Sequence, residues 1–116
     1  MEESAFIRVF GRSPVVKLLD FLLVERGLYD YSMSEISENA DVSWTTLHRI
    51  FPELLALGVV KKTRQVGRAS MYAVNEMHPL TKDLIEMRAK ISDYFAESEL
   101  LRQAEAKSAL PAALPQ

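Results

Sequence analysis

The stretch Ser34–Phe51, SEISENADVSWTTLHRIF, decides the fold of this chain. Five of its apolar residues are spaced so that they can point inward together: Ile36, Ala40, Val42, Leu47 and Ile50. The first two close one face of a short helix, the third plugs a tight turn, and the last two anchor a second helix at i, i+3 spacing. The pattern predicts a helix-turn-helix. The alternative is an ordinary corner between two helices.

Polar residues mark the ends of these two helices. Ser32 and Glu35 stand in the S-x-x-E relation of a capping box, so the first helix is predicted to begin at Met33. Asp41 falls in the turn, where a positive φ is needed and a short polar side chain tolerates it. Ser43 is the predicted N-cap of the second helix.

The outward positions of the second helix favour a groove over a core. They carry hydrogen-bond donors, a ring and a cation: Trp44, Thr45, His48 and Arg49. The Ser43 hydroxyl and the first free N–H groups of this helix form a predicted anion site that suits a phosphate. The alternatives are a Trp44 ring that is partly buried against the first helix of the chain, and a His48 that faces solvent without a task.

Residues 1–12, before the motif, are predicted to form a short extended arm that packs on the domain. Ser13-Pro14 is a good helix start, and the apolar residues after it recur at helical spacing until Gly27. On the other side, the second helix of the motif is predicted to reach Leu57 before Gly58. Pro52 falls inside this span, so it predicts either a bent helix or a break near Phe51.

From Val59 the pattern becomes extended, as VVKKTRQV, GRA and SMYAVN. Two β-prone runs around a turn at Gly67 predict an antiparallel hairpin in which Val60 and Val66 face the domain. The basic residues of the hairpin should remain in water: Lys61, Lys62, Arg64 and Arg68. A hairpin with arginine at its tip after a helix-turn-helix predicts a winged helix; the alternative is a charged edge strand protected by lysines.

Charge is distributed unevenly along the chain. The whole sequence has a net charge of −2, but residues 44–75 carry five basic side chains and one acidic side chain, a local +4. Positive charge is therefore concentrated in the motif and the hairpin that follows it. Such a local concentration is typical of a surface that attracts phosphates.

The last predicted element is a long helix over residues 77–103. Apolar residues recur along it at alternating spacings of three and four, which is typical of a coiled-coil seam. The seam residues predicted to hold two copies together are Leu80, Leu84, Met87, Ile91, Tyr94 and Leu101. A homodimer is therefore expected, the alternative being an amphipathic helix folded on its own core. Residues 104–116 are predicted to be a disordered tail.

Composition excludes several other classes. The 116 residues contain no cysteine, which rules out disulfides, thiolate metal sites and a cysteine nucleophile. We expect a soluble cytoplasmic protein, because no signal peptide or membrane-length apolar run is present. No catalytic or phosphate-loop motif occurs, so neither an enzyme nor a cofactor or metal site is predicted.

The runs ISENADVSWTTLHRI and LLALGVVKKTRQVGRASMYAVN resemble the winged helix-turn-helix transcriptional regulators, near the MarR, ArsR and PadR families. The resemblance covers residues 13–75 and includes the joining pattern L-x-x-L-G-x-V, with Leu54, Leu57, Gly58 and Val60 in place. It implies a mainly helical α+β fold, with a winged helix-turn-helix domain over residues 13–76. It also implies a homodimer on double-stranded DNA, with the third helices in successive major grooves and the wings on the flanking minor groove or backbone.

The residues of the motif then divide into two groups. Thr45, His48 and Arg49 are expected to read base edges, while Ser43, Thr46 and the wing cations hold phosphates. Trp44, bulkier than the usual first recognition residue, would stack on a sugar or pack on a thymine methyl. The alternative function is a winged-helix protein-interaction adaptor. A ligand pocket between the first helix and the C-terminal helix, near Tyr29, Tyr31 and Tyr94, is a further hypothesis.

Overall fold

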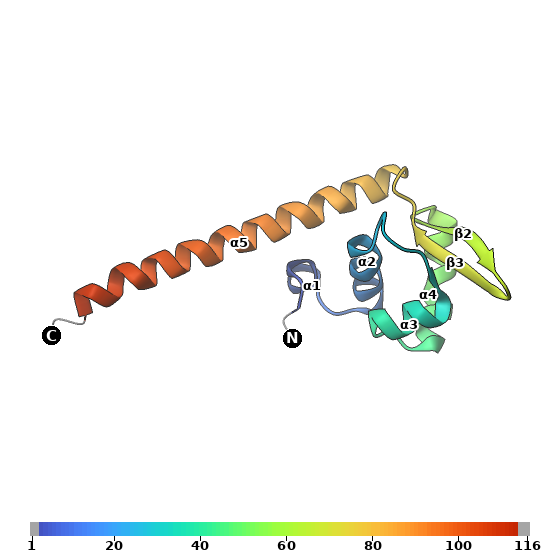
Figure 1. Cartoon of the computed structure of the whole chain (residues 1–116), viewed down its shortest axis with the longest axis horizontal. Helices are drawn as coiled ribbons and strands as arrows, with labels where there is room; N and C mark the ends of the chain where they lie inside the picture. Colours follow the sequence, from blue (N-terminus) through green and yellow to red (C-terminus); the bar gives the residue numbers. More distant parts are fainter. Residues whose placement is uncertain (1–2, 114–116) are drawn as a thin grey trace.

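Five helices and a three-stranded antiparallel sheet make up the residues that the computed structural model describes, which are 3–113 for the backbone and 3–107 for the side chains. Figure 1 shows their arrangement. The elements are α1 (Ala5–Phe10), α2 (Pro14–Val24), β1 (Tyr31–Ser32), α3 (Met33–Ala40), α4 (Trp44–Leu57), β2 (Val60–Val66), β3 (Ala69–Val74) and α5 (Pro79–Ala113). The fold is therefore mainly helical α+β, as predicted.

The core lies where α2, α3 and α4 meet one face of the sheet. Its side chains are almost fully shielded from water: Phe6, Leu18, Leu22, Leu23, Ile36, Ala40, Val42, Leu47, Phe51, Leu54, Val59, Val60 and Val74. Four of the five inward residues predicted in the helix-turn-helix belong to this set, and Ile50 packs against it. Burial of these apolar side chains fixes α4 on α2 and α3, with its other face outward.

The turn between α3 and α4 is held by specific hydrogen bonds. Asp41 adopts the predicted left-handed conformation, with φ of 57°. Ser37 Oγ donates to the carbonyl of Val42 at 2.6 Å, and the Lys17 ammonium of α2 donates to the carbonyl of Asp41, also at 2.6 Å. The capping box at Ser32 is confirmed. The angle between the two helices is therefore fixed by α2 as well as by the turn itself.

One continuous helix, α4, runs through Pro52. Proline removes one backbone hydrogen bond, but Phe51 and Leu54 on either side of it are buried in the core and hold the helix together. The helix ends as predicted at Gly58, which has a φ of 84°. The break near Phe51, which the sequence left open, does not occur.

The hairpin consists of β2 and β3, joined through Gly67, and a short third strand, β1, pairs with β3. Two residues are too few for β1 to give a period-two pattern in the sequence. Val60 is buried as predicted, but the prediction that Val66 faces the domain is wrong, because the tip of the hairpin extends past the core and leaves Val66 half exposed. Figure 1 shows this extension.

The N-terminal segment is helical, so the prediction of an extended arm is wrong. Ser4 caps α1 by accepting the N–H of Ile7, and Gly11 ends it with a φ of 91°. Phe6 is buried, which confirms that the segment packs on the domain. The Arg8 guanidinium lies 4.4 Å from the centre of the Phe95 ring, and this contact joins α1 to α5.

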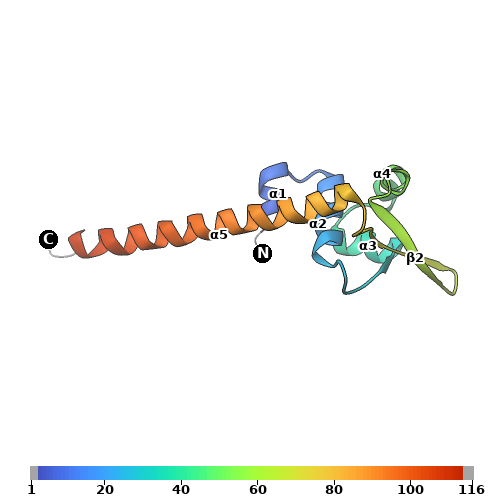
Figure 2. The same ribbon diagram turned by 90° about the horizontal axis from the view of Figure 1, so that it is seen from above.

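The longest element is α5, which gives the chain principal extents of 69 × 28 × 22 Å. In Figure 1 and Figure 2 it leaves the other elements and extends well beyond α1. Its last described residue is Ala113, so the prediction of a disordered segment from residue 104 is wrong as far as that residue. Alanine has the highest helix propensity, and five alanines lie between residues 104 and 113. Residues 114–116 lie outside the described part.

Only one stripe of α5 packs on the rest of the chain. Thr81 is fully buried, and Leu84, Ile85 and Ile91 pack against the core. Arg88 Nε donates to Asp20 Oδ1 of α2 at 3.0 Å. Within the described residues, no helix is both long and apolar enough to cross a membrane.

Candidate nucleic-acid interface

The outer face of α4 presents the residues that the sequence predicted there. Trp44, Thr45, His48 and Arg49 are all exposed. The Trp44 ring is 52% exposed and lies 4.0 Å, between ring centres, from the His48 ring. Trp44 therefore packs on the next turn of its own helix. The alternative in which this ring braces the first helix, α2, does not fit that contact.

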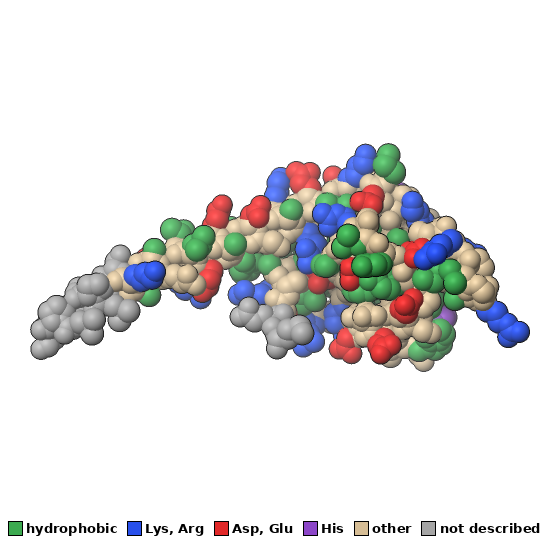
Figure 3. All heavy atoms as spheres, viewed as in Figure 1, with side chains coloured by type: hydrophobic (Ala, Val, Ile, Leu, Met, Phe, Trp, Pro, Cys, Tyr) green, Lys and Arg blue, Asp and Glu red, His purple; other side chains and the backbone are tan. Residues whose placement is uncertain are grey.

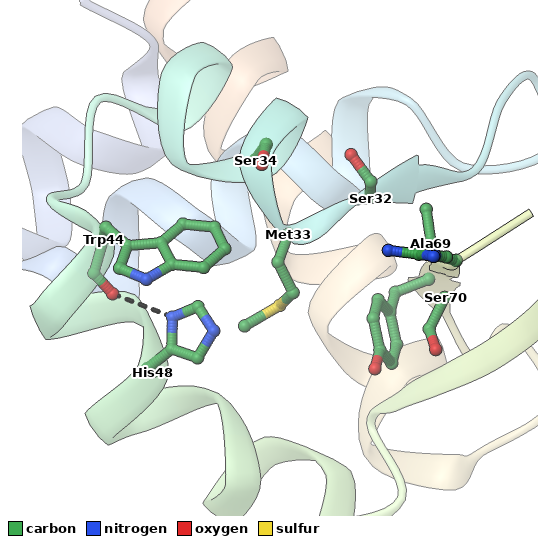
Figure 4. A pocket seen from close by; sticks show the side chains of 9 residues that line it. Ser32, Met33, Ser34, Trp44, His48, Ala69 and Ser70 are labelled. Atoms are coloured by element: carbon green, nitrogen blue, oxygen red, sulfur yellow. Dashed lines mark hydrogen bonds between the residues drawn. The ribbon is translucent and has the colours of Figure 1, made fainter.

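The surroundings of His48 fix the position of its hydrogen. His48 Nδ1 lies 3.0 Å from the carbonyl oxygen of Trp44 (Figure 4, dashed line). A carbonyl oxygen only accepts hydrogen bonds, so Nδ1 carries the hydrogen and donates. In the neutral ring, Nε2 is then an acceptor, available to a donor outside the protein.

An open hollow of about 420 Å³ lies between α4 and the wing, the β2–β3 hairpin. Three segments of the chain line it: Ser32, Met33 and Ser34 of β1 and α3; Trp44 and His48 of α4; and Arg68, Ala69, Ser70 and Tyr72 of the wing. Figure 4 shows Met33 pointing into the space between His48 and the wing residues. The N-terminal ends of two helices and a wing cation therefore meet at one concave surface.

The N-terminus of α4 is capped tightly. Ser43 Oγ accepts the N–H of Thr46 at 3.2 Å and donates to Thr46 Oγ1 at 2.9 Å. The cap therefore satisfies only the N–H of Thr46. The backbone N–H groups of Trp44 and Thr45, the first two of the helix, have no partner among the described residues. These N–H groups carry the positive end of the helix dipole.

The four wing cations divide between the two faces of the hairpin. Lys62 pairs across the strands with Tyr72, whose ring packs on Phe51 of α4, so Lys62 lies on the α4 side. A register shift at Thr63 then reverses the alternation, and Arg64 pairs with Met71. Lys61 and Arg64 lie on the opposite face, where they line a second hollow.

Arg64 is held in an ion pair that the sequence reasoning missed. Its Nε and one terminal nitrogen donate to the two carboxylate oxygens of Asp30, at 2.9 and 3.0 Å, and Thr63 donates to the same carboxylate. These hydrogen bonds lower the pKa of Asp30 from 3.8 to about 2. Asp30 precedes β1, so the pair ties the middle of β2 to the loop after α2.

The remaining basic residues of the candidate interface are exposed: Arg49, Lys61, Lys62 and Arg68. None of them forms an ion pair with another residue in the part of the chain that the structure describes. Figure 3 shows Lys and Arg side chains along the wing and at its tip. Their charge is therefore available to an anionic partner.

Sequence reasoning missed three contributors to this surface. Met33 and Ser34 line the hollow, but their place there depends on how α3 packs beside the wing. Lys17 holds the turn before α4 from 24 residues away. The one sequence signal for this part of the surface is the capping box at Ser32, which predicts the N-terminus of α3. Across the described side chains, no group of three or more His, Cys, Asp or Glu is placed to hold a metal ion.

A helix-turn-helix with an exposed second helix, followed by a two-stranded wing, defines a winged helix-turn-helix fold. A solved structure with the same fold, "The crystal structure of transcriptional regulator PA3341", is 21% identical and superposes with a TM-score of 0.54. The match covers 85% of this chain and 75% of that one. No family model matches the sequence, and the search of curated proteins finds no match.

Proposed function

We propose that the chain is a transcriptional regulator that binds double-stranded DNA as a homodimer. In this proposal α4 lies in the major groove and the wing contacts the flanking backbone or minor groove. The single observation that carries it is the hollow shared by α4 and the wing, where Trp44 and His48 lie opposite Arg68. The fold shared with a protein described as a transcriptional regulator supports the same function.

The physical match is between this hollow and a sugar-phosphate backbone. The free N–H groups of α4 and the Arg68 cation favour negative charge at the same concave surface. With α4 in the major groove, its exposed side chains would offer hydrogen-bond donors and an acceptor to the base edges. We assign base contacts to Thr45, His48 and Arg49.

Phosphate contacts are assigned to the side of the wing that faces α4. Lys62 and Arg68 lie on that side, and we propose that they bind phosphates directly. Lys61 faces away, so in this proposal it acts through the long-range positive potential of the wing. Arg64 also faces away, and its charge is compensated by Asp30, so we assign it no phosphate contact. Ser43 and Thr46 position the N-terminus of α4, whose N–H groups make the contact.

The test is fluorescence anisotropy of a labelled random duplex, titrated with the protein at several salt concentrations. We expect binding that weakens steeply with salt, by about 0.9 log units per log unit of salt for each phosphate neutralised. Arg68→Ala should lower both the affinity and the salt slope. Arg102→Ala, which removes an arginine from the exposed part of α5, is the matched control and should change neither.

Absence of binding at low salt would overturn the proposal. The half-exposed Trp44 would then be examined as a contact for a protein partner, which is the adaptor alternative.

A further inference from the structure

A third concave surface lies among the helices and is almost purely apolar. It has a volume of about 390 Å³ and is lined by residues of α1, α2, α4 and α5 with Val59: Phe10, Leu19, Leu54, Leu57, Val59, Leu80, Asp83, Leu84 and Met87. We call it the apolar groove. Asp83 is its one charged residue. Exposure of such an apolar surface to water is unfavourable, and surfaces of this kind commonly mark interaction sites.

The same helix that lines the groove carries an exposed apolar stripe beyond it. Leu80, Met87, Tyr94 and Leu101 follow one another at intervals of seven residues, and each is about half exposed or more. The first two line the apolar groove, and the last two lie on the part of α5 that extends away from it. Figure 3 shows hydrophobic side chains continuing along this extended part.

This stripe differs from the one that packs on the domain. Thr81, Arg88 and Phe95 contact the domain and are also seven residues apart, but they lie on another side of the helix. Leu84, Ile85 and Ile91 also pack against the core, so Leu84 and Ile91 of the predicted seam are used within the chain. The chain's own elements therefore satisfy one stripe and leave the other uncovered. A seven-residue apolar repeat is the surface that a second helix packs against.

We propose that the apolar groove is the docking site for α5 of a second copy of this chain, running antiparallel. The segment 94–101 of each copy then lies on the segment 80–87 of the other, with the two-fold axis near Ile91. This inference deepens the proposed function, since it specifies how the proposed homodimer is built. Both copies contribute a groove and a stripe, so the interface closes on itself.

The antiparallel direction follows from shape. A parallel pair would place groove against groove, and two concave surfaces leave a void where they face each other. An antiparallel pair places the convex, extended half of one helix in the groove of the other, which fills both grooves. The extended half of α5 also gains the neighbour that its own chain does not provide.

The docked helix would reach the recognition helix directly. Leu54 and Leu57 form the last turn of α4 and line the groove. The second copy would therefore pack on the same helix whose other end faces the DNA hollow. Dimerisation would then also hold α4 in its orientation.

Cysteine cross-linking tests the arrangement, because the natural chain contains no cysteine. Leu57→Cys and Leu101→Cys variants are prepared separately, mixed and oxidised. We expect a disulfide-linked product between the two variants that exceeds the product of either variant alone. A product formed mainly by Leu101→Cys with itself would indicate a parallel pair and overturn the proposal.

Sedimentation equilibrium provides the second readout. The unmodified chain should have twice the 13.1 kDa chain mass, and Leu101→Glu should lose the dimer. Leu28→Glu, at an exposed leucine outside the groove, is the matched control and should remain dimeric. Circular dichroism establishes that both variants are folded.

A monomeric natural chain would overturn the inference, including the case of a monomer whose groove binds an apolar dye. The random-duplex titration separates this outcome from failure of the proposed function. A monomer that still binds DNA leaves the DNA-binding proposal intact and removes only the docking of α5.

Discussion

His48 and Arg49 are neighbours on α4, but the structure constrains them differently. The Trp44 ring and carbonyl fix the plane and the tautomer of His48. Arg49 is exposed and forms no ion pair with a described residue, so no such pair holds its guanidinium in one position. A constrained imidazole suits recognition of one donor, whereas a mobile guanidinium is ordered only when it reaches a bidentate acceptor such as guanine O6 and N7.

At the residue scale, the first prediction separates base contacts from phosphate contacts. Arg49→Ala should cost about 1–3 kcal/mol on a preferred duplex, selected from a random pool, and less on random DNA. Arg68→Ala should weaken binding to both duplexes alike, because a phosphate contact carries no sequence information. Anisotropy titrations of each variant on both duplexes measure the difference. Equal losses on the two duplexes for both variants would contradict this division.

The carboxylate of Asp30 makes the stability of the fold depend on pH. Arg64 lowers its pKa from 3.8 to about 2, so the ionised form stabilises the fold above pH 3.8 and this contribution is lost as the pH falls through 2. Asp30→Asn should therefore lower the melting temperature at pH 7, and the difference from the natural chain should disappear near pH 2. Thermal denaturation at a series of pH values measures it.

Asp93→Asn, at an exposed carboxylate of α5 that forms no ion pair with a described residue, is the control for Asp30→Asn and should leave the melting temperature at pH 7 unchanged. A difference for Asp30→Asn that is constant from pH 7 to pH 2 would show that the ion pair with Arg64 does not support the wing.

The sequence predicts the two faces of the wing only in part, because β2 does not alternate regularly along its length. Strict period-two alternation puts Lys62 and Arg64 on the same face, but the register shift at Thr63 puts them on opposite faces. A bulge leaves no clear mark in a run such as VKKTRQV. The partner of Arg64, Asp30, is 34 residues away and belongs to a loop, so no local pattern could connect the two.

At the element scale, the point where α4, β2 and α5 meet is the most tightly determined junction. Gly58 ends α4 in the left-handed conformation, and a Cβ at this position would lie 2.9 Å from Cδ2 of His78. The side chain of Asn75 donates to the carbonyl of Gly58, and the backbone of Asn75 donates to that of Val59. The recognition helix and the long helix are therefore joined through a few fixed atoms.

The third prediction tests this junction. Gly58→Ala should lower the free energy of unfolding by more than the roughly 1–2 kcal/mol that the left-handed conformation costs a residue with a Cβ. The excess arises because the added methyl group meets the His78 ring. Urea denaturation measures the change in midpoint.

Gly67→Ala is the matched control for Gly58→Ala. Its φ is also positive, at +59°, but nothing lies within 4 Å of the added Cβ. It should therefore cost the conformational part alone. Equal losses for the two variants would show that His78 moves away freely and does not fix the junction.

Elements with strong local signals were predicted well, and those shaped by tertiary contacts were not. Capping residues and apolar periodicity gave α2, α3, α4 and the hairpin, since these signals are encoded within a few residues. Local signals for α1 exist in the Ser4 cap and in Gly11 at its end, but six residues are too few to show a helical period. Its packing through Phe6 and through the contact of Arg8 with Phe95 involves residues far away in the sequence. The stripe of α5 that packs on the domain depends in the same way on Asp20 of α2.

At the scale of the whole molecule, the shape is unusual for a chain of this length. The radius of gyration is 18.8 Å, whereas a compact domain of 116 residues has about 13 Å. The difference comes from α5, which extends past the elements that cover its first half (Figure 2). Most stability of a helix in water comes from packing of an apolar face, so the extended half needs a neighbour.

The fourth prediction links this shape to DNA binding. In the proposed homodimer each bound particle carries two α4 helices and two wings, so it neutralises about twice as many phosphates as a monomer does. The slope of log affinity against log salt is proportional to that number. Leu101→Glu, which should prevent docking of α5, is expected to reduce the slope on a random duplex by about half.

Anisotropy titrations between low and physiological salt measure the slope, with sedimentation on the same samples. Leu100→Glu is the control, because it makes the same change of charge at an equally exposed leucine of α5 that lies off the seven-residue stripe, and it should keep the slope of the natural chain. The slope reports phosphates per bound particle, whereas affinity also reflects any loss of fold. A monomeric Leu101→Glu variant with an unchanged slope would therefore mean that only one domain of the dimer contacts DNA, and the second α4 would have no partner in the groove.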